Sequence, residues 1–112
     1  MRNISFAFTK EQFLNGTKDV TRSLGWKDLK SGQRLMAIEK GMGLAKGEKI
    51  VRLGVIEILT AIRERLWMIN QADVIREGFP TRTPEQFIDF FCEANNCNPD
   101  DDVTRIEFKR VK

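Results

Sequence analysis

The sequence contains no histidine. Without imidazole, the chain cannot form a Ser-His or Cys-His catalytic pair, and it cannot build a zinc site that uses histidine ligands. Any proton transfer must therefore use lysine, glutamate, aspartate or cysteine. The two cysteines, Cys92 and Cys97, are too few for a four-ligand metal site. We therefore expect neither a metal nor a cofactor.

Long apolar runs are also missing. No stretch reaches the length of a membrane-spanning helix, and the N-terminus lacks the apolar core of a secretory signal. We therefore expect a cytoplasmic protein with reduced thiols and no membrane partner. The chain has 112 residues, 41% of them hydrophobic and 31% charged, which indicates a single globular domain spanning residues 1–112. A net charge of +3 allows a nucleic-acid partner but does not require one.

The hydrophobic pattern predicts strands and helices in the order β-α-β-β-β-α-α-β. Alternating or β-branched residues indicate strands, and capping residues or glycines mark the ends of helices. The expected strands cover residues 4–8, the segment around Thr21, and residues 34–39, 50–66 and 103–111. The expected helices follow Thr9, cover residues 70–77 and follow Thr83.

The segment 50–66 allows two interpretations. Its valines and isoleucines favour a strand, in which Gly54 marks a bulge or a sharp bend. Residues 55–66 also fit helical spacing, so a helix is the alternative. With the strand interpretation, the chain is an α+β domain, and a small mixed β-barrel with flanking helices would bury the edges of its sheet.

The strongest helix signal begins at Thr83, which is followed by proline at the first helical position and Gln86 at the third. Aromatic residues recur along this helix at helical spacing. We interpret that stripe as part of the core and not as a surface on which bases stack. It consists of Phe87, Phe90 and Phe91, followed by Ala94.

The segment Gly16–Arg22 places a lysine, a hydroxyl and a guanidinium close together. Gly16 suits the left-handed conformation at which many helices end. In a regular strand, Lys18 and Arg22 would face one side and Thr21 the other. Lys18 and Thr21 can share a pocket only if Lys18 lies on a turn or a bulge. The alternative is a connection between helix and strand with solvated charges.

The same segment, Gly16-x-Lys18-x-x-Thr21-Arg22, stands before a turn that ends at Ser31-Gly32. With Glu77-Gly78-Phe79 ahead of a phenylalanine-rich helix, it resembles the signature of the ASCH family. The resemblance runs along the whole chain to the closing strand at residues 104–108. It implies a PUA-like barrel with a cleft for RNA or modified nucleosides.

Some ASCH proteins are amidohydrolases that remove the acyl group from N4-acylated cytidine with a lysine, a threonine and a glutamate. The resemblance places these roles on Lys18, Thr21 and Glu77. Other members are described as RNA-binding proteins or ribonucleases. Family members commonly carry a basic residue at the position that Ser23 holds here. Arg22 stands one place earlier, and in a regular strand its side chain would therefore point to the opposite face from that family position.

A binding module is the alternative to the enzyme. In that case Lys18 and four further basic residues would form a rim that holds RNA phosphates without chemistry, and the affinity would fall with salt. The four further residues are Arg22, Lys27, Lys30 and Arg34. A domain that binds a protein partner is the third possibility.

Overall fold

The structure, a computed structural model, describes residues 1–41 and 44–111. Its elements follow each other in the predicted order, with one additional short 3-10 helix, Leu66–Met68. The strands are β1 (Asn3–Ser5), β2 (Val20–Ser23), β3 (Arg34–Ile38), β4 (Arg52–Arg65) and β5 (Asp102–Arg110). The helices are α1 (Lys10–Leu14), α2 (Gln71–Arg76) and α3 (Pro84–Asn95).

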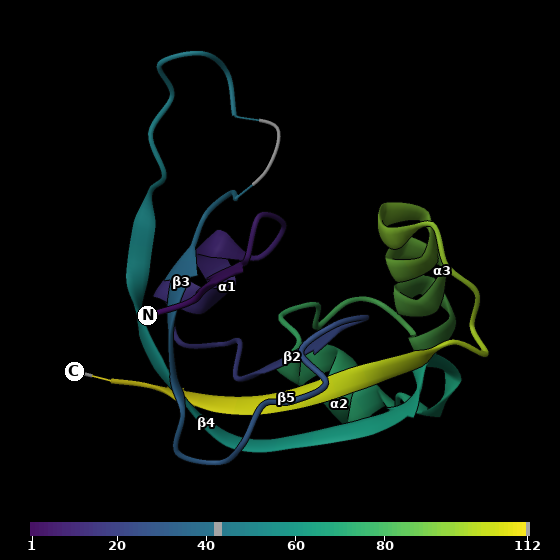
Figure 1. Cartoon of the computed structure of the whole chain (residues 1–112). Helices are drawn as coiled ribbons and strands as arrows, with labels where there is room; N and C mark the ends of the chain where they lie inside the picture. The colour runs from purple at the N-terminus through teal and green to yellow at the C-terminus, as the bar shows by residue number, and fades with distance from the viewer. Residues whose placement is uncertain (42–43, 112) are drawn as a thin grey trace.

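The five strands form one mixed sheet in the order β1-β3-β4-β5-β2. β1 pairs with β3 in parallel, and the other three pairs are antiparallel. The α+β class is confirmed. Within residues 1–41 and 44–111 the edge strands β1 and β2 do not pair with each other, so the sheet is not closed and a barrel is not confirmed. In Figure 1, β4 and β5 cross the width of the molecule, with α1 near one end and α3 at the other.

The strand interpretation of residues 50–66 is confirmed, because β4 covers 14 residues and pairs with both β3 and β5. The register against β3 shifts beside Gly54, where the pairing steps from Gly54 to Arg52. Gly54 has a φ of 154°, a conformation that glycine adopts without steric cost. The irregularity predicted at Gly54 is therefore present.

The first strand is shorter than predicted. β1 ends at Ser5, and the amide of Thr9 donates to the carbonyl of Phe6, which closes a turn through Ala7 and Phe8. Phe8 therefore leaves the sheet and is 67% exposed. The predicted capping box at Thr9 is also wrong. The Thr9 side chain makes no cap hydrogen bond, and Gln12 instead donates to the carbonyl of Gly78 on a distant segment.

The start of α3 is as predicted. The Thr83 hydroxyl accepts from the amide of Gln86 at 3.1 Å, and the Gln86 side chain accepts from the amide of Thr83 at 2.8 Å. The prediction of a wholly buried aromatic stripe is wrong in part. Phe87 and Phe91 are buried, whereas Phe90 is half-buried and Ala94 is exposed. Phe90 packs against Phe8 and Phe79 at the surface instead of entering the core.

Two hydrophobic clusters stabilise the domain. The first joins α1 to β1, β3, β4 and β5 and includes Phe6 and Phe13. The second joins α3 to α2, to the 3-10 helix and to the start of β5, and includes Phe87 and Phe91. Phe6 and these two helix residues all line one cavity, which therefore lies between the clusters.

Gly78 ends the segment after α2 with a φ of 108°, and a Cβ at this position would lie 2.9 Å from the Cβ of Gln12. We expect Gly78→Ala to lower the free energy of unfolding by about 2 kcal/mol or more, because backbone strain and a steric contact act together. Gly16→Ala is the matched control. Its φ is also positive, at 83°, but nothing lies within 4 Å, so we expect the smaller cost of about 1 kcal/mol. Urea unfolding of both variants measures the difference, and equal losses would contradict the steric argument.

Candidate functional site

A cavity of about 470 Å³ opens between the turn after β1, the strand β2 and the helix α3. This volume is in the range of pockets that bind small organic molecules. Six of the eight phenylalanines of the chain line it, together with a few polar side chains. The phenylalanines are Phe6, Phe8, Phe79, Phe87, Phe90 and Phe91.

Lys18 lies on the segment between α1 and β2, outside the regular strand. Its side chain is buried, at 4% exposure, and its amine donates to three oxygens. The carbonyls of Val20 and Glu77 lie at 2.9 Å, and the Glu77 Oε1 lies at 3.1 Å. An ammonium has three protons, so these three acceptors match a protonated Lys18.

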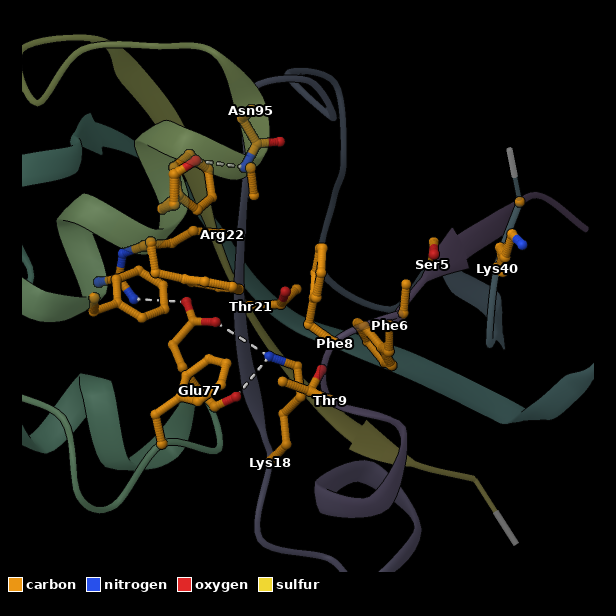
Figure 2. A pocket seen from close by; sticks show the side chains of 17 residues that line it. Ser5, Phe6, Phe8, Thr9, Lys18, Thr21, Arg22, Lys40, Glu77 and Asn95 are labelled. Atoms are coloured by element: carbon orange, nitrogen blue, oxygen red, sulfur yellow. Dashed lines mark hydrogen bonds and ion pairs between the residues drawn. The ribbon is translucent and has the colours of Figure 1, made fainter. Parts of the chain in front are cut away.

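Glu77 follows the last residue of α2 and is 3% exposed. Figure 2 shows its carboxylate between Lys18 and Arg22. Oε1 accepts from the Lys18 amine, and Oε2 accepts from Nη1 of Arg22 at 3.1 Å. One buried carboxylate thus carries two cations, which offsets part of the cost of burying all three charges.

Burial lowers the pKa of Lys18, because the charged ammonium is removed from water. Glu77 opposes this shift, since its negative charge and its hydrogen bond favour the ammonium. The charge of Arg22 lowers the pKa of Lys18 further, and Asp19 raises it. We assign a lowered pKa to Lys18, with burial as the main cause.

Thr21 lies in β2, is half-buried and lines the same cavity as Lys18 and Glu77. The position of Lys18 ahead of the strand is what allows both residues to face one cavity. The Lys18 amine donates to the three oxygens named above and, among the described residues, not to the Thr21 hydroxyl. The hydroxyl and the amine therefore belong to residues that line the same cavity, and no hydrogen bond joins them.

Neither a scan against models of known protein families nor a search of curated proteins finds a match. Solved structures, however, share the architecture. A crystal structure of an Enterococcus faecalis V583 protein of the family DUF984 aligns with a TM-score of 0.62 and 17% identity. The alignment covers 91% of this chain and 66% of that one, slightly under two thirds.

The ASCH domain from Lactobacillus crispatus JV V101 aligns with a TM-score of 0.63 and 14% identity over 97% of this chain and 79% of that one. The chain has an ASCH-like fold. At such low identity the match establishes the fold alone. The sequence resemblance to the ASCH family is thus matched by a similarity in fold that covers nearly the whole chain.

In this ASCH-like fold, the predicted site residues fall into two groups. Lys18, Thr21, Arg22 and Glu77 line the cavity. Lys27, Lys30 and Arg34 are exposed and are not part of its lining.

Arg22 is buried, at 6% exposure, although the strand alternation separates it from Thr21. Its guanidinium contacts carboxylates from β4 and α2 as well as Glu77. Sequence reasoning missed those two partners, Glu64 and Asp73. Asp73 is a charged residue on the buried face of α2, and such a position indicates that the side chain has a charged partner inside the protein.

The aromatic mouth of the cavity was also missed. Phe8 meets Phe90 edge to face at 5.3 Å, and Phe79 meets Phe90 at the same distance. The Arg82 guanidinium lies 4.4 Å from the ring centres of both Phe79 and Phe90. The half-buried Phe90 and the exposed Phe8 therefore give the cavity an apolar wall in which two rings stand nearly perpendicular to each other.

Two further observations concern metal ions and membranes. Within residues 1–41 and 44–111, no group of three or more acidic or cysteine side chains is arranged to hold a metal ion. In the same residues, no helix has the length and apolar character needed to cross a bilayer.

Proposed function

We propose that this ASCH-like domain hydrolyses the acyl amide of an N4-acylated cytidine, with Thr21 as nucleophile and Lys18 as base. One observation carries the proposal: a single cavity with aromatic walls brings together Lys18, Thr21 and Glu77. These are the three residues that the ASCH resemblance assigns to amide hydrolysis. In a chain without histidine, a lysine beside a hydroxyl is a suitable arrangement for acyl transfer.

The cavity suits a planar ring at its opening. Phe8, Phe79 and Phe90 present apolar edges and faces to a base, and ring contacts of this kind add about 0.5–1.5 kcal/mol beyond the area buried. A volume of about 470 Å³ accommodates a nucleoside rather than a folded RNA. The acyl group would then enter first, towards Thr21 and Lys18.

The chemistry proceeds in two steps. The Thr21 oxygen attacks the amide carbon, its proton passes to a neutral Lys18, and the bond between that carbon and N4 breaks as N4 takes the proton. The acyl group is then an ester on Thr21, which water hydrolyses to regenerate the hydroxyl and release the acid. Lys18 must start neutral, and its lowered pKa favours that state.

A specific observation favours a second function, RNA binding without hydrolysis. All three protons of the Lys18 ammonium are donated to oxygens in the structure, so no lone pair faces Thr21. With Lys18 held in this state, the cavity would bind a base and perform no chemistry. The basic residues outside the cavity would then contact RNA phosphates.

We expect the wild-type protein to release cytidine from N4-acetylcytidine, as measured by chromatography. Acetanilide, an acetyl amide on a different ring, serves as the control substrate and should be hydrolysed far more slowly because it lacks the polar edge of cytosine. In parallel, a short single-stranded RNA is titrated at two salt concentrations. No turnover together with salt-sensitive RNA affinity would replace the enzyme with the binding module.

A further inference from the structure

The Arg22 guanidinium contacts three carboxylates of the protein. Its Nη1 donates to Glu77 at 3.1 Å, its Nη2 donates to Asp73 at 2.5 Å, and Nη2 lies 3.5 Å from the Glu64 carboxylate. The side chain is 1% exposed in these ion pairs. Both terminal nitrogens therefore already contact carboxylates of the protein.

Asp73 fixes Arg22 in this position. Arg105 donates to the two carboxylate oxygens of Asp73 at 2.7 and 3.1 Å, from the neighbouring strand β5. The hydrogen bonds from Arg105, together with the weaker effect of the one from Arg22, lower the pKa of Asp73 to about 2. Asp73 is thus ionised at neutral pH and holds Arg22 on one side while Arg105 holds Asp73 on the other.

The result is a row of alternating charges that runs from the cavity into α2 and β5. It begins at Lys18 and continues through Glu77, Arg22 and Asp73 to Arg105. Arginine keeps its proton at any physiological pH, whereas a buried lysine readily gives its proton up. Of the two cations on Glu77, Lys18 is therefore the one that can become neutral.

We propose that Arg22 is a positioning residue that acts through Glu77: by holding the second carboxylate oxygen, it weakens the grip of Glu77 on the Lys18 proton and supplies the site with a neutral amine. Asp73 keeps Arg22 in place for this task. The inference rests on the proposed function in one respect, which is that the neutral Lys18 amine serves as the base for Thr21. It differs from the sequence-based hypothesis that Arg22 contacts substrate, because both Nη atoms already contact carboxylates of the protein.

The surroundings of Lys18 fit this role. The charged groups that act on it are Glu77, Arg22 and Asp19, and Arg22 is the only cation among them. Its charge lowers the pKa of Lys18, in the same direction as burial. The groups around Arg22 itself are Glu64, Asp73 and Glu77. Without the Arg22 charge, the Glu77 carboxylate would no longer be shared between two cations and would stabilise the Lys18 ammonium more strongly.

The test follows the titration of Lys18 directly, by the NMR shift of the carbon beside its amine in lysine-labelled protein. We expect Arg22→Gln to raise the pH at which Lys18 titrates by about one unit or more, because a repelling cation is lost. Arg22→Met removes the same charge with a side chain of similar length and serves where the glutamine variant does not fold. Arg65→Gln is the matched control, since Arg65 pairs with exposed Asp102 and not with Lys18 or Glu77.

Hydrolysis of N4-acetylcytidine gives the second measurement. In Arg22→Gln, the pH range over which kcat rises should shift to higher pH by the same amount as the Lys18 titration. KM should stay close to the wild-type value. A raised KM with an unchanged pH profile would instead make Arg22 a substrate contact and overturn the inference. An unshifted Lys18 titration in both variants would overturn it as well. A shifted titration in a protein that hydrolyses nothing would uphold the role of Arg22 and reject the proposed function.

Discussion

Replacing Thr21 with alanine is expected to lower kcat for N4-acetylcytidine by at least ~10³-fold, because the variant lacks the oxygen that attacks the amide carbon. Thr21 lines the cavity from β2 beside the Lys18 and Glu77 pair. The loss should appear in kcat, and binding of the unreactive product cytidine should remain near the wild-type level. Chromatographic assay and a binding titration measure the two quantities separately.

Two control variants sharpen this result. Thr21→Ser keeps a hydroxyl at the same place and should retain a substantial part of the activity. Thr17→Ala removes a nearby threonine hydroxyl that bonds to exposed Asn15, outside the cavity, and should change little. Should Thr21→Ala keep its activity within about tenfold of wild type, water would be the attacking group and Thr21 would only orient it.

Replacing Glu77 with alanine is expected to lower the free energy of unfolding by about 3–5 kcal/mol, the range for removing one partner of a buried ion pair. The variant leaves Lys18 and one nitrogen of Arg22 without their carboxylate, in a place where neither side chain reaches water. Urea unfolding followed by circular dichroism measures the loss through the midpoint and slope of the transition.

Glu57→Ala is the matched control for this prediction. Glu57 contacts Arg34 at 3.5 Å and Lys109 at 3.6 Å, but both partners are exposed, so we expect a loss below about 1 kcal/mol. In the double variant Lys18→Met/Glu77→Ala, the uncompensated lysine charge is also removed. Its loss of unfolding free energy should be smaller than the sum of the losses in Lys18→Met and Glu77→Ala by at least about 1 kcal/mol. Additive losses would show that the two side chains do not stabilise each other.

The sequence predicted those features that depend on neighbouring residues. The capping box at Thr83 needs only Thr83 and Gln86, three positions apart, and both hydrogen bonds are present. The helix end at Gly16 needs only a glycine with positive φ, and Gly16 has a φ of 83°. The order of the strands and helices followed from such local signals.

Features decided by distant residues could not be predicted in the same way. The Thr9 capping box failed because Gln12 bonds to Gly78, 66 positions away, and no local pattern reports that partner. The surroundings of Arg22 were hidden for the same reason, since Asp73 lies 51 positions further along the chain. Phe90 was placed in the core because helical spacing tells which face is apolar but not how far a neighbouring element covers it.

The place of β5 in the sheet has a consequence for how the protein forms. β5 pairs with both β4 and β2, so β2 has no neighbour in the sheet until residues 102–110 are available. Such long separations between paired residues slow the search for the native structure. On the ribosome, residues 20–23 must wait for about eighty further residues before they find their partner, at synthesis rates of about 5–20 residues per second. Lys18, Thr21 and Arg22 therefore reach their final positions only after most of the chain has been synthesised.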